Sequence, residues 1–360
     1  MRLVGRRGRV LRRALYGLVT AVSVLGTLEV GARALGGDAL SVGEPPAPAD
    51  GAPTLKGSPY LLWEYAPGER FELGLPVRIN RHGLRGAEPG PEARLMVTGD
   101  SSVYGYGVAD DEVFVVKAAQ AAGMSPVNAA IPGYSSFQTR NLLALRGWDL
   151  EPDVLVIGNL WSDNNFDSFV DRELLSAYAD WEDGPTARLR SAFSFSAFFR
   201  VLDVTLRVSR GRQAEARRVG WTVGGGEPSG ERRVALPDYA ANLEALADEA
   251  RARGADVMYL LLPHPDDLRP REGPAAWTPY REVMRAVAAR VGALVVEGPT
   301  VFAASGASKS ELFLDEMHPT ATGHALLADA LVEALEEAPP PPDQAHPLDL
   351  VDPFAGRGPR

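Results

Sequence analysis

Two short motifs carry the residue types of a nucleophile, a base and a carboxylate. The motif Gly99-Asp100-Ser101-Ser102 follows an apolar run at residues 95–97, so its serines lie on a predicted turn after a strand. A serine hydroxyl is a weak nucleophile and needs a basic partner, which itself needs a group to orient it. Asp315 and His318, three residues apart near the carboxyl end of the chain, have the types for these two roles.

Of the five histidines, His318 suits the role of base best. The others are His82, His264, His324 and His346. His318 lies in a predicted loop before a helix over 322–337, where Asp315 can bond one ring nitrogen while the other faces the serine. Each motif alone is a weak signal: Gly-Asp-Ser-Ser could be a plain turn, and Asp315 could cap the following turn. Their combination, in this order, favours Ser101 as the nucleophile.

The elements that must position these residues alternate along the chain. Short apolar runs at 95–97, 127–131, 154–158, 256–262 and 293–296 predict buried strands. Helical patterns over 112–122, 138–145, 237–253, 280–291 and 322–337 separate or follow them. This alternation predicts an α/β fold, with a parallel sheet covered by helices on both faces. Ser101 would then lie at the carboxyl end of a strand, where such sheets bind ligands.

Composition excludes several classes of function. The net charge of −10 argues against nucleic acid as a partner. With no cysteine in 360 residues, a disulfide, a thiolate nucleophile or a cysteine metal site is impossible. No His, Asp or Glu cluster has metal-ligand spacing, so we expect neither a metal nor another cofactor. The sequence leaves the oligomeric state open.

The amino terminus predicts export or membrane anchoring. Six arginines and no acidic residue occupy residues 1–13, and residues 14–28 are uncharged and mostly apolar. One interpretation is an uncleaved anchor at residues 14–30, with the arginines cytoplasmic and the catalytic domain outside the cytoplasmic membrane. The other is a signal segment cleaved near Ala32-Arg33-Ala34, which would give a secreted protein.

The remaining boundaries follow from composition. Residues 1–35 form the basic flank and apolar segment, and residues 36–58 are a flexible linker rich in Gly, Pro and Ala. The catalytic domain is expected at 59–338, with an insertion at about 167–235 that either borders the site or is peripheral to it. Residues 339–360 form a Pro-rich tail that we expect to be disordered.

The motifs together resemble the GDSL/SGNH hydrolase family of serine esterases and lipases, over roughly residues 80–335. The resemblance implies a three-layer α/β/α fold with a flavodoxin-like parallel sheet of about five strands. It also implies a triad of Ser101, His318 and Asp315. In this family a glycine N–H of the second motif helps to bind the oxyanion, and the match here is Gly133 in Ile-Pro-Gly-Tyr.

The third family motif is altered. The family pattern is Gly-x-Asn-Asp, and its asparagine is a further oxyanion donor. In Trp161-Ser-Asp-Asn-Asn165, Ser162 stands in the place of that asparagine. The oxyanion hole is therefore expected from the Ser101 and Gly133 N–H groups and one side chain, either Ser162 or Asn164, with Asn164 slightly preferred.

Three functions fit these observations. The first is an exported or membrane-anchored serine hydrolase that cleaves acyl or acetyl esters of a small molecule, lipid or glycan. The second is an O-acetyltransferase of the same fold that acts on an envelope polysaccharide. The third is a non-catalytic carbohydrate-binding or assembly protein, which only the altered third motif favours. The acyl-chain length is not predicted.

Overall fold

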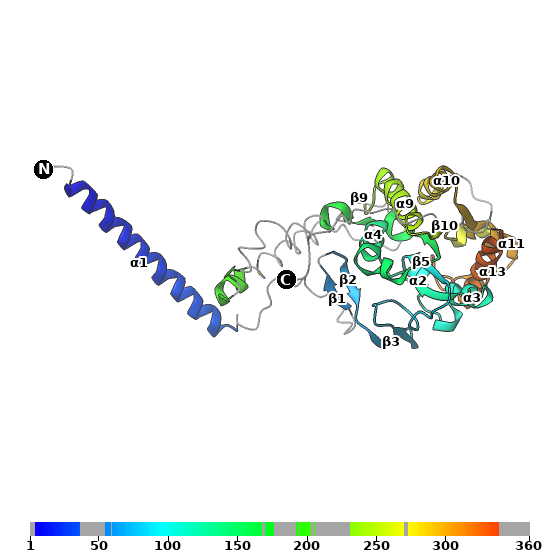
Figure 1. Cartoon of the computed structure of the whole chain (residues 1–360), viewed down its shortest axis with the longest axis horizontal. Helices are drawn as coiled ribbons and strands as arrows, with labels where there is room; N and C mark the ends of the chain where they lie inside the picture. Colours follow the sequence, from blue (N-terminus) through cyan, green and yellow to red (C-terminus); the bar gives the residue numbers. More distant parts are fainter. Residues whose placement is uncertain are drawn as a thin grey trace. The chain divides into compact units, whose positions relative to one another are not determined.

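The chain forms two compact units. The computed structural model describes residues 4–36, 55–58, 60–167, 170–175, 192–193, 195–202, 205, 231–269 and 273–337 (Figure 1). The first unit combines Met1–Pro46 with Ser176–Arg218, and the second combines Ala47–Leu175 with Val219–Arg360. The predicted tail at 339–360 lies outside the described residues.

The core of the second unit is a five-stranded parallel sheet in the order β11-β10-β7-β5-β6. The strands are β5 (Arg94–Gly99), β6 (Ser125–Asn128), β7 (Val154–Gly158), β10 (Asp256–Leu261) and β11 (Leu294–Glu297). Every residue of β7 is buried, as its continuous apolar run predicts. The predicted α/β fold with about five parallel strands is confirmed.

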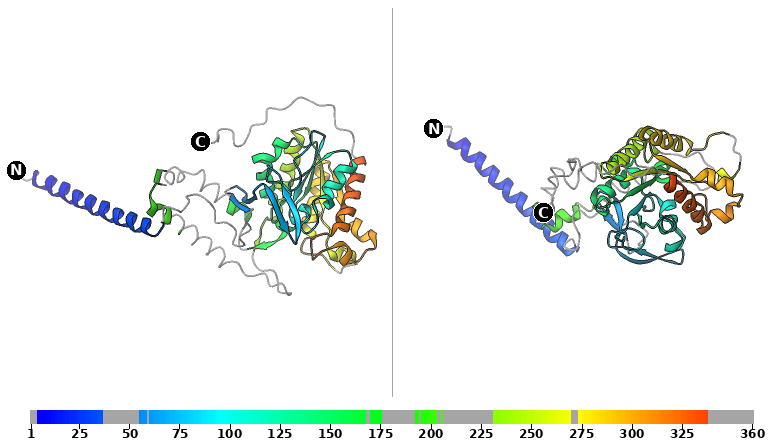
Figure 2. Two further views of the ribbon diagram at one scale, coloured as in Figure 1. Left: turned by 90° about the horizontal axis from the view of Figure 1, so that it is seen from below. Right: turned by 45° about the vertical axis from the view of Figure 1, so that its right-hand side comes forward.

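Helices cover both faces of this sheet, so the unit has three layers (Figure 2). Helix α3 (Phe114–Ala121) packs against α13 (Ala321–Glu337), whereas α9 (Leu236–Arg251) packs against α10 (Thr278–Val291) and α4 (Ser136–Leu142). The shorter helices α11 (Gly298–Ser305) and α12 (Lys309–Leu312) precede α13.

The strand order reverses direction beside β5. The chain leaves β5 for β6 on one side and then crosses to β7 on the other, with Gly99 paired to Gly158 at the carboxyl ends. Open α/β sheets bind ligands at such a reversal, because the loops that follow the two strands separate there. The segments after β5 and β7 are therefore the ones expected to build the site.

Two antiparallel hairpins precede the sheet. Strand β1 (Leu55–Ser58) pairs with β2 (Leu62–Tyr65), and β3 (Gly68–Glu72) pairs with β4 (Leu75–Ile79). The last four residues of the predicted linker thus form a strand, because Leu55 to Ser58 find a partner in the aromatic-rich segment that follows.

The predicted insertion at 167–235 is divided between the two units. Its ends belong to the second unit, where β8 (Phe166–Asp167) pairs with β9 (Glu231–Arg232) and a buried ion pair joins Asp171 to Arg233 at 2.9 Å. Residues 176–218 group with the first unit instead. Residues 206–230 of the insertion lie outside the described residues.

The first unit contains the long helix α1 (Val4–Ala34). Its stretch Arg12–Ala34 is long and apolar enough to cross a membrane, and the same test is passed by a signal sequence. The side chains of this stretch are mostly exposed, including Leu18, Val22 and Leu25. Within the described side chains of this stretch, only Glu29 and Ala32 are covered, and the Glu29 carboxylate accepts a hydrogen bond from Ser196 in the 176–218 part of the unit.

Candidate active site

The turn after β5 presents Ser101 at the start of the short helix α2 (Ser101–Tyr104). The turn is tight: a Cβ on Gly99 would lie 2.5 Å from Val103 Cγ2, so only glycine fits there. Asp100 caps the helix, since its Oδ1 accepts the N–H of Ser102 at 3.1 Å. The glycine and the aspartate of the motif therefore set the position of the serine.

The side chain of Asp100 also joins the two strand ends. Its Oδ2 accepts the N–H of Trp161 at 2.7 Å and that of Ser162 at 3.2 Å, both in the short helix α5 (Trp161–Asn164) after β7. Burial raises the pKa of Asp100 above its ordinary value of 3.8, although the three backbone N–H groups favour the anion. Sequence reasoning missed this connection, because it depends on the pairing of β5 with β7.

Ser101, His318 and Asp315 form a chain of hydrogen bonds. Ser101 Oγ is 2.7 Å from His318 Nε2, and His318 Nδ1 is 2.6 Å from Asp315 Oδ2. Asp315 Oδ1 accepts the backbone N–H groups of Met317 and His318 at 2.8 and 2.9 Å, which holds the loop before α13 in shape. This is the geometry in which a histidine can take a proton from a serine.

The ionisation of Asp315 suits an orienting carboxylate. Its partial burial raises the pKa, but the hydrogen bonds from the His318 ring and from the Met317 and His318 N–H groups outweigh that cost. The pKa of Asp315 is therefore below its ordinary value of 3.8, and the carboxylate is charged at neutral pH.

The loop that carries His318 is also tied to the nucleophile helix. Ser102, the second serine of the motif, donates its hydroxyl to Met317 O at 2.8 Å, across 215 positions of sequence. Its hydroxyl is therefore engaged with the backbone, whereas that of Ser101 faces the imidazole. The Tyr106 ring centroid lies 5.0 Å from that of His318, while Tyr104 is fully buried and bonds Glu72.

Gly133 follows β6 with a backbone conformation that favours glycine, at φ +81°. A Cβ at this position would lie 2.9 Å from Trp63 Cζ2. Within the described part of the chain, neither the N–H of Gly133 nor that of Ser101 donates a hydrogen bond to the protein. Both groups are thus available to an oxyanion.

The two side chains expected to complete the oxyanion hole differ in their partners. The Asn164 side-chain oxygen accepts a hydrogen bond from Arg232, which also bonds the Asn164 main-chain carbonyl. Ser162 is largely buried, its N–H is held by Asp100, and its hydroxyl has no protein partner among the described residues. Of the two side chains, only the Ser162 hydroxyl is therefore without a hydrogen-bond partner among the described residues.

Asp163, between them, has a structural connection that the sequence did not reveal. It is fully buried, and its carboxylate accepts the Ser136 N–H at 3.0 Å and the Ser136 hydroxyl at 2.5 Å. Asn242 of α9 donates to the same hydroxyl at 3.0 Å. Burial raises the pKa of Asp163 to about 7, and the bonds from Ser136 oppose this shift. This cluster links the third motif to α4, which follows the Gly133 turn.

The remaining histidines have other environments. His324 is fully buried in α13, accepts the Phe114 N–H and stacks on the Phe114 ring, and burial lowers its pKa to about 3. His82 lies beside Arg81 and Glu88. His346 is outside the described residues. Within the described residues, no group of three or more His, Asp or Glu could hold a metal ion.

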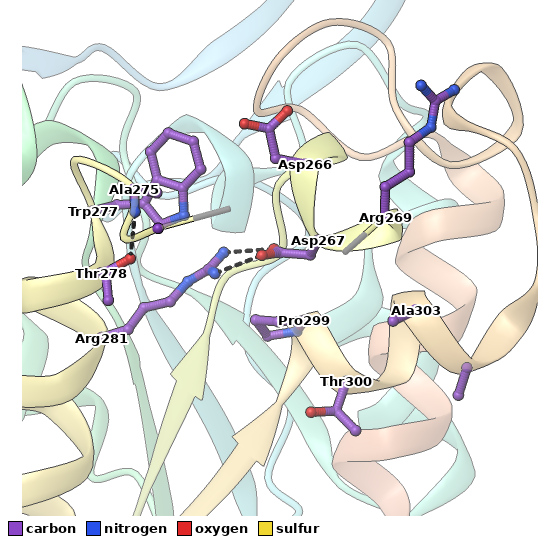
Figure 3. A pocket seen from close by; sticks show the side chains of 12 residues that line it. Asp266, Asp267, Arg269, Ala275, Trp277, Thr278, Arg281, Pro299, Thr300 and Ala303 are labelled. Atoms are coloured by element: carbon purple, nitrogen blue, oxygen red, sulfur yellow. Dashed lines mark hydrogen bonds and ion pairs between the residues drawn. The ribbon is translucent and has the colours of Figure 1, made fainter. Parts of the chain in front are cut away.

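A hollow of about 690 Å³ is lined by residues that follow β10 and by the start of α11 (Figure 3). Its wall includes Trp277 and the bidentate pair of Asp267 with Arg281, at 2.9 and 2.8 Å. Trp277 stacks on His264 with centroids 3.8 Å apart, and the His264 ring is 5.7 Å from Trp161. Burial lowers the pKa of His264, which favours the neutral ring. None of the three triad side chains lines this hollow.

Three solved structures are among those that match this chain. LAE5, an alpha/beta hydrolase enzyme from the metagenome of Lake Arreo in Spain, is 18% identical and covers 68% of this chain and 95% of its own, with a TM-score of 0.42. Axe2, an acetylxylan esterase from Geobacillus stearothermophilus, is 16% identical, with coverages of 68% and 94% and a TM-score of 0.43. A lipase/acylhydrolase from Enterococcus faecalis is 16% identical, with coverages of 70% and 100% and a TM-score of 0.43.

Comparison of the sequence with family models gives a match over part of the chain. No curated protein matches the chain. The model of the GDSL-like lipase/acylhydrolase family matches residues 167–326, an interval that includes Asp315 and His318 and ends before α13 is complete. The segment that carries Ser101 precedes the matched interval and contributes the Gly-Asp-Ser turn described above. The similarity to the GDSL-like lipase/acylhydrolase family is therefore carried by residues 167–326.

Proposed function

We propose that this protein is a membrane-anchored serine ester hydrolase, with Ser101 as nucleophile, His318 as general base and acid, and Asp315 as the orienting carboxylate. The observation that carries the proposal is the pair of contacts at the imidazole, 2.7 Å to Ser101 Oγ and 2.6 Å to Asp315 Oδ2. A turn or a cap would require neither contact. The lipase and acylhydrolase family of the domain agrees with an acyl ester as substrate.

The reaction follows from this geometry. Ser101 Oγ attacks the acyl carbonyl carbon as its proton passes to His318 Nε2, and Asp315 stabilises the imidazolium that results. The leaving alcohol takes the proton from His318, which leaves an acyl ester on Ser101. A water molecule then attacks this ester, with His318 again as base, and releases the acid.

The oxyanion of each tetrahedral intermediate would be bound by three donors. Two are the N–H groups of Ser101 and Gly133, which have no acceptor within the described part of the protein. We assign the third to the Ser162 hydroxyl rather than to Asn164, because Arg232 holds the Asn164 amide oxygen and so restrains the orientation of that side chain. A hydroxyl donor also agrees with the absence of asparagine from this position of the motif.

The anchor is part of the proposal. The arginines of residues 1–13 precede a helix that is long and apolar enough to span a membrane. By the positive-inside rule the amino terminus would be cytoplasmic, and the hydrolase domain would lie on the other side of the membrane.

The test uses the full chain in detergent with p-nitrophenyl acetate and a fluorophosphonate probe. We expect the wild type to hydrolyse the ester and to be labelled on Ser101, and S101A and H318A to lose both activities while remaining folded. Peptide mapping supplies an internal control, because Ser102 is adjacent yet should carry no label. A folded wild type that neither turns over nor labels would refute the esterase assignment.

The same preparation tests the transferase alternative. The enzyme is given p-nitrophenyl acetate together with an acceptor glycan. If acetylated glycan forms and less free acetate is released, the reaction of this triad is O-acetyl transfer rather than hydrolysis.

A further inference from the structure

The part of the insertion that belongs to the first unit contacts the end of α1. The docked segment, residues 192–193 and 195–202, meets Glu29, whose carboxylate accepts three hydrogen bonds from it. The Ser196 hydroxyl donates at 2.7 Å, and the Ala197 and Phe198 N–H groups each donate at 3.0 Å. In Figure 1 this segment is the short green helical piece beside the carboxyl end of α1.

The contact is specific rather than incidental. Residues 197–202 are helical, and Glu29 bonds N–H groups at the start of that helix, where they have no partner within the helix. Ala197 of the docked segment is fully buried. Ala32 of α1 is 6% exposed, whereas the other described side chains of α1 are exposed or only partly covered. Arg33, one turn after Glu29, pairs with the same carboxylate at 2.8 Å.

The depth of Glu29 in a membrane follows from the length of α1. Glu29 lies sixteen positions after Arg13, which is about 24 Å along a helix at 1.5 Å per residue. The hydrocarbon core of a bilayer is about 30 Å thick. If Arg13 lies at the inner boundary, Glu29 reaches the outer boundary region, where a bare carboxylate is costly. Arg33 and the three donors of the docked segment satisfy that carboxylate.

The docked segment must then lie at the same depth. Its free surface is aromatic and aliphatic: Phe195 is 70% exposed, Phe193 48% and Leu202 42%. Exposed Phe and Leu side chains on a short helical segment are typical of chains that bind at the boundary between headgroups and acyl chains. Val30 of α1 and Leu35, which follows the end of α1, are also exposed.

We propose that the docked segment is a second membrane contact, in which Phe193, Phe195 and Leu202 insert into the outer interface of the bilayer beside the anchor helix. The proposal rests on the proposed anchoring by α1. It also makes α1 part of a folded unit, because cleavage near Ala32-Arg33-Ala34 would remove Glu29, the residue that holds the segment.

The absence of cysteine makes the test direct. Single-cysteine variants of the full chain carry an environment-sensitive fluorophore and are reconstituted in phosphatidylcholine and phosphatidylglycerol vesicles. Lipids with a spin label near the headgroup or near the end of the acyl chain then report depth, and aqueous iodide reports exposure to water. F195C tests the segment, V22C tests the anchor, and S310C, on an exposed residue of α12, is the aqueous control.

We expect the label at position 195 to be quenched at least twofold more strongly by the shallow spin label than by the deep one, and to be shielded from iodide. V22C should be quenched best by the deep label, and S310C by iodide alone. A label at position 195 that behaves like S310C, or that no quencher reaches, would overturn the inference while V22C still upholds the anchor. Loss of lipid quenching at V22C would instead show that the anchoring itself is wrong.

A further variant addresses the role of Glu29. E29A removes the acceptor of all three bonds, so the shallow quenching at position 195 should fall by half or more. The matched variant S23A, on an exposed residue of the same helix, should leave it unchanged. Equal quenching in E29A and S23A would count against docking through Glu29.

Discussion

Replacing Asp315 with asparagine reverses the proton arrangement of the imidazole. Asp315 Oδ1 accepts two backbone N–H groups, so the single oxygen of an asparagine is expected to stay at that position. Its amide nitrogen would then face His318 Nδ1, which becomes an acceptor. The ring proton moves to Nε2, which points at Ser101 Oγ, and His318 can no longer take the serine proton.

The size of the effect depends on exposure. A fully buried triad aspartate contributes about 10⁴-fold to kcat in the serine protease that serves as the reference case. The Asp315 side chain is 51% exposed, so water competes for the imidazole and screens the carboxylate. We therefore expect D315N to lower kcat about 10²- to 10³-fold, or ~3–4 kcal/mol of barrier at 1.36 kcal/mol per tenfold.

The assay compares kcat and KM of the full chain on p-nitrophenyl acetate, with the thermal unfolding midpoint measured on the same samples. D315N should unfold within a few degrees of wild type, because the loop keeps its two backbone bonds. E316Q is the matched control, because Glu316 is the next residue, is exposed and bonds Lys309. The kcat of E316Q should stay within about twofold of the wild-type value. A D315N enzyme that keeps a third or more of the wild-type kcat would refute the tautomer argument.

Three further changes test the surroundings of the nucleophile. S162A should lower kcat by about 10²-fold through loss of an oxyanion donor, whereas N164A should change it less than about threefold; the reverse order would reassign the donor. G133A places a Cβ 2.9 Å from Trp63 and a side chain at φ +81°, so kcat should fall about 10²-fold and the unfolding midpoint should drop, and wild-type values of both would contradict this. Because burial raises the pKa of Asp163 to about 7 in the folded state, its contribution to stability is largest at low pH and declines as pH rises from about 4 to about 7. The unfolding midpoint of D163N relative to wild type should therefore increase over that interval, and a flat difference would exclude the shift.

The fold was largely predictable because its signals are local. Buried parallel strands are continuous apolar runs, and those of β5, β7 and β10 stand out from the helical patterns around them. The arrangement of the insertion was not predictable, because its two ends belong to one unit and its middle to the other. Nothing in the composition of residues 167–235 shows that Arg233 pairs with Asp171 in one unit while Ser196 bonds Glu29 in the other.

The candidate site was predictable in part for the same reason. Ser101, Asp315 and His318 belong to motifs whose spacing has a chemical meaning. The choice between Ser162 and Asn164 depends on Arg232, which reaches Asn164 from 68 positions away. No spacing rule could give that contact, and the choice of oxyanion donor between these two side chains stays a prediction.

By itself, the sequence determined the types of the reacting groups, the elements that carry them and the basic flank before an apolar helix. These are properties of short segments, set by side-chain chemistry and periodicity. Only the tertiary structure decided how those groups are held. Asp100 joins the segments after β5 and β7, and Ser102 bonds the loop that carries His318. Asp163 accepts the Ser136 hydroxyl, and Glu29 accepts hydrogen bonds from the docked segment. Asp100, Ser102 and Asp163 are polar groups shielded from water, and such a group must find a partner wherever the folded chain brings one. That partner is set by the packing of distant segments, so it lies beyond the reach of any local pattern.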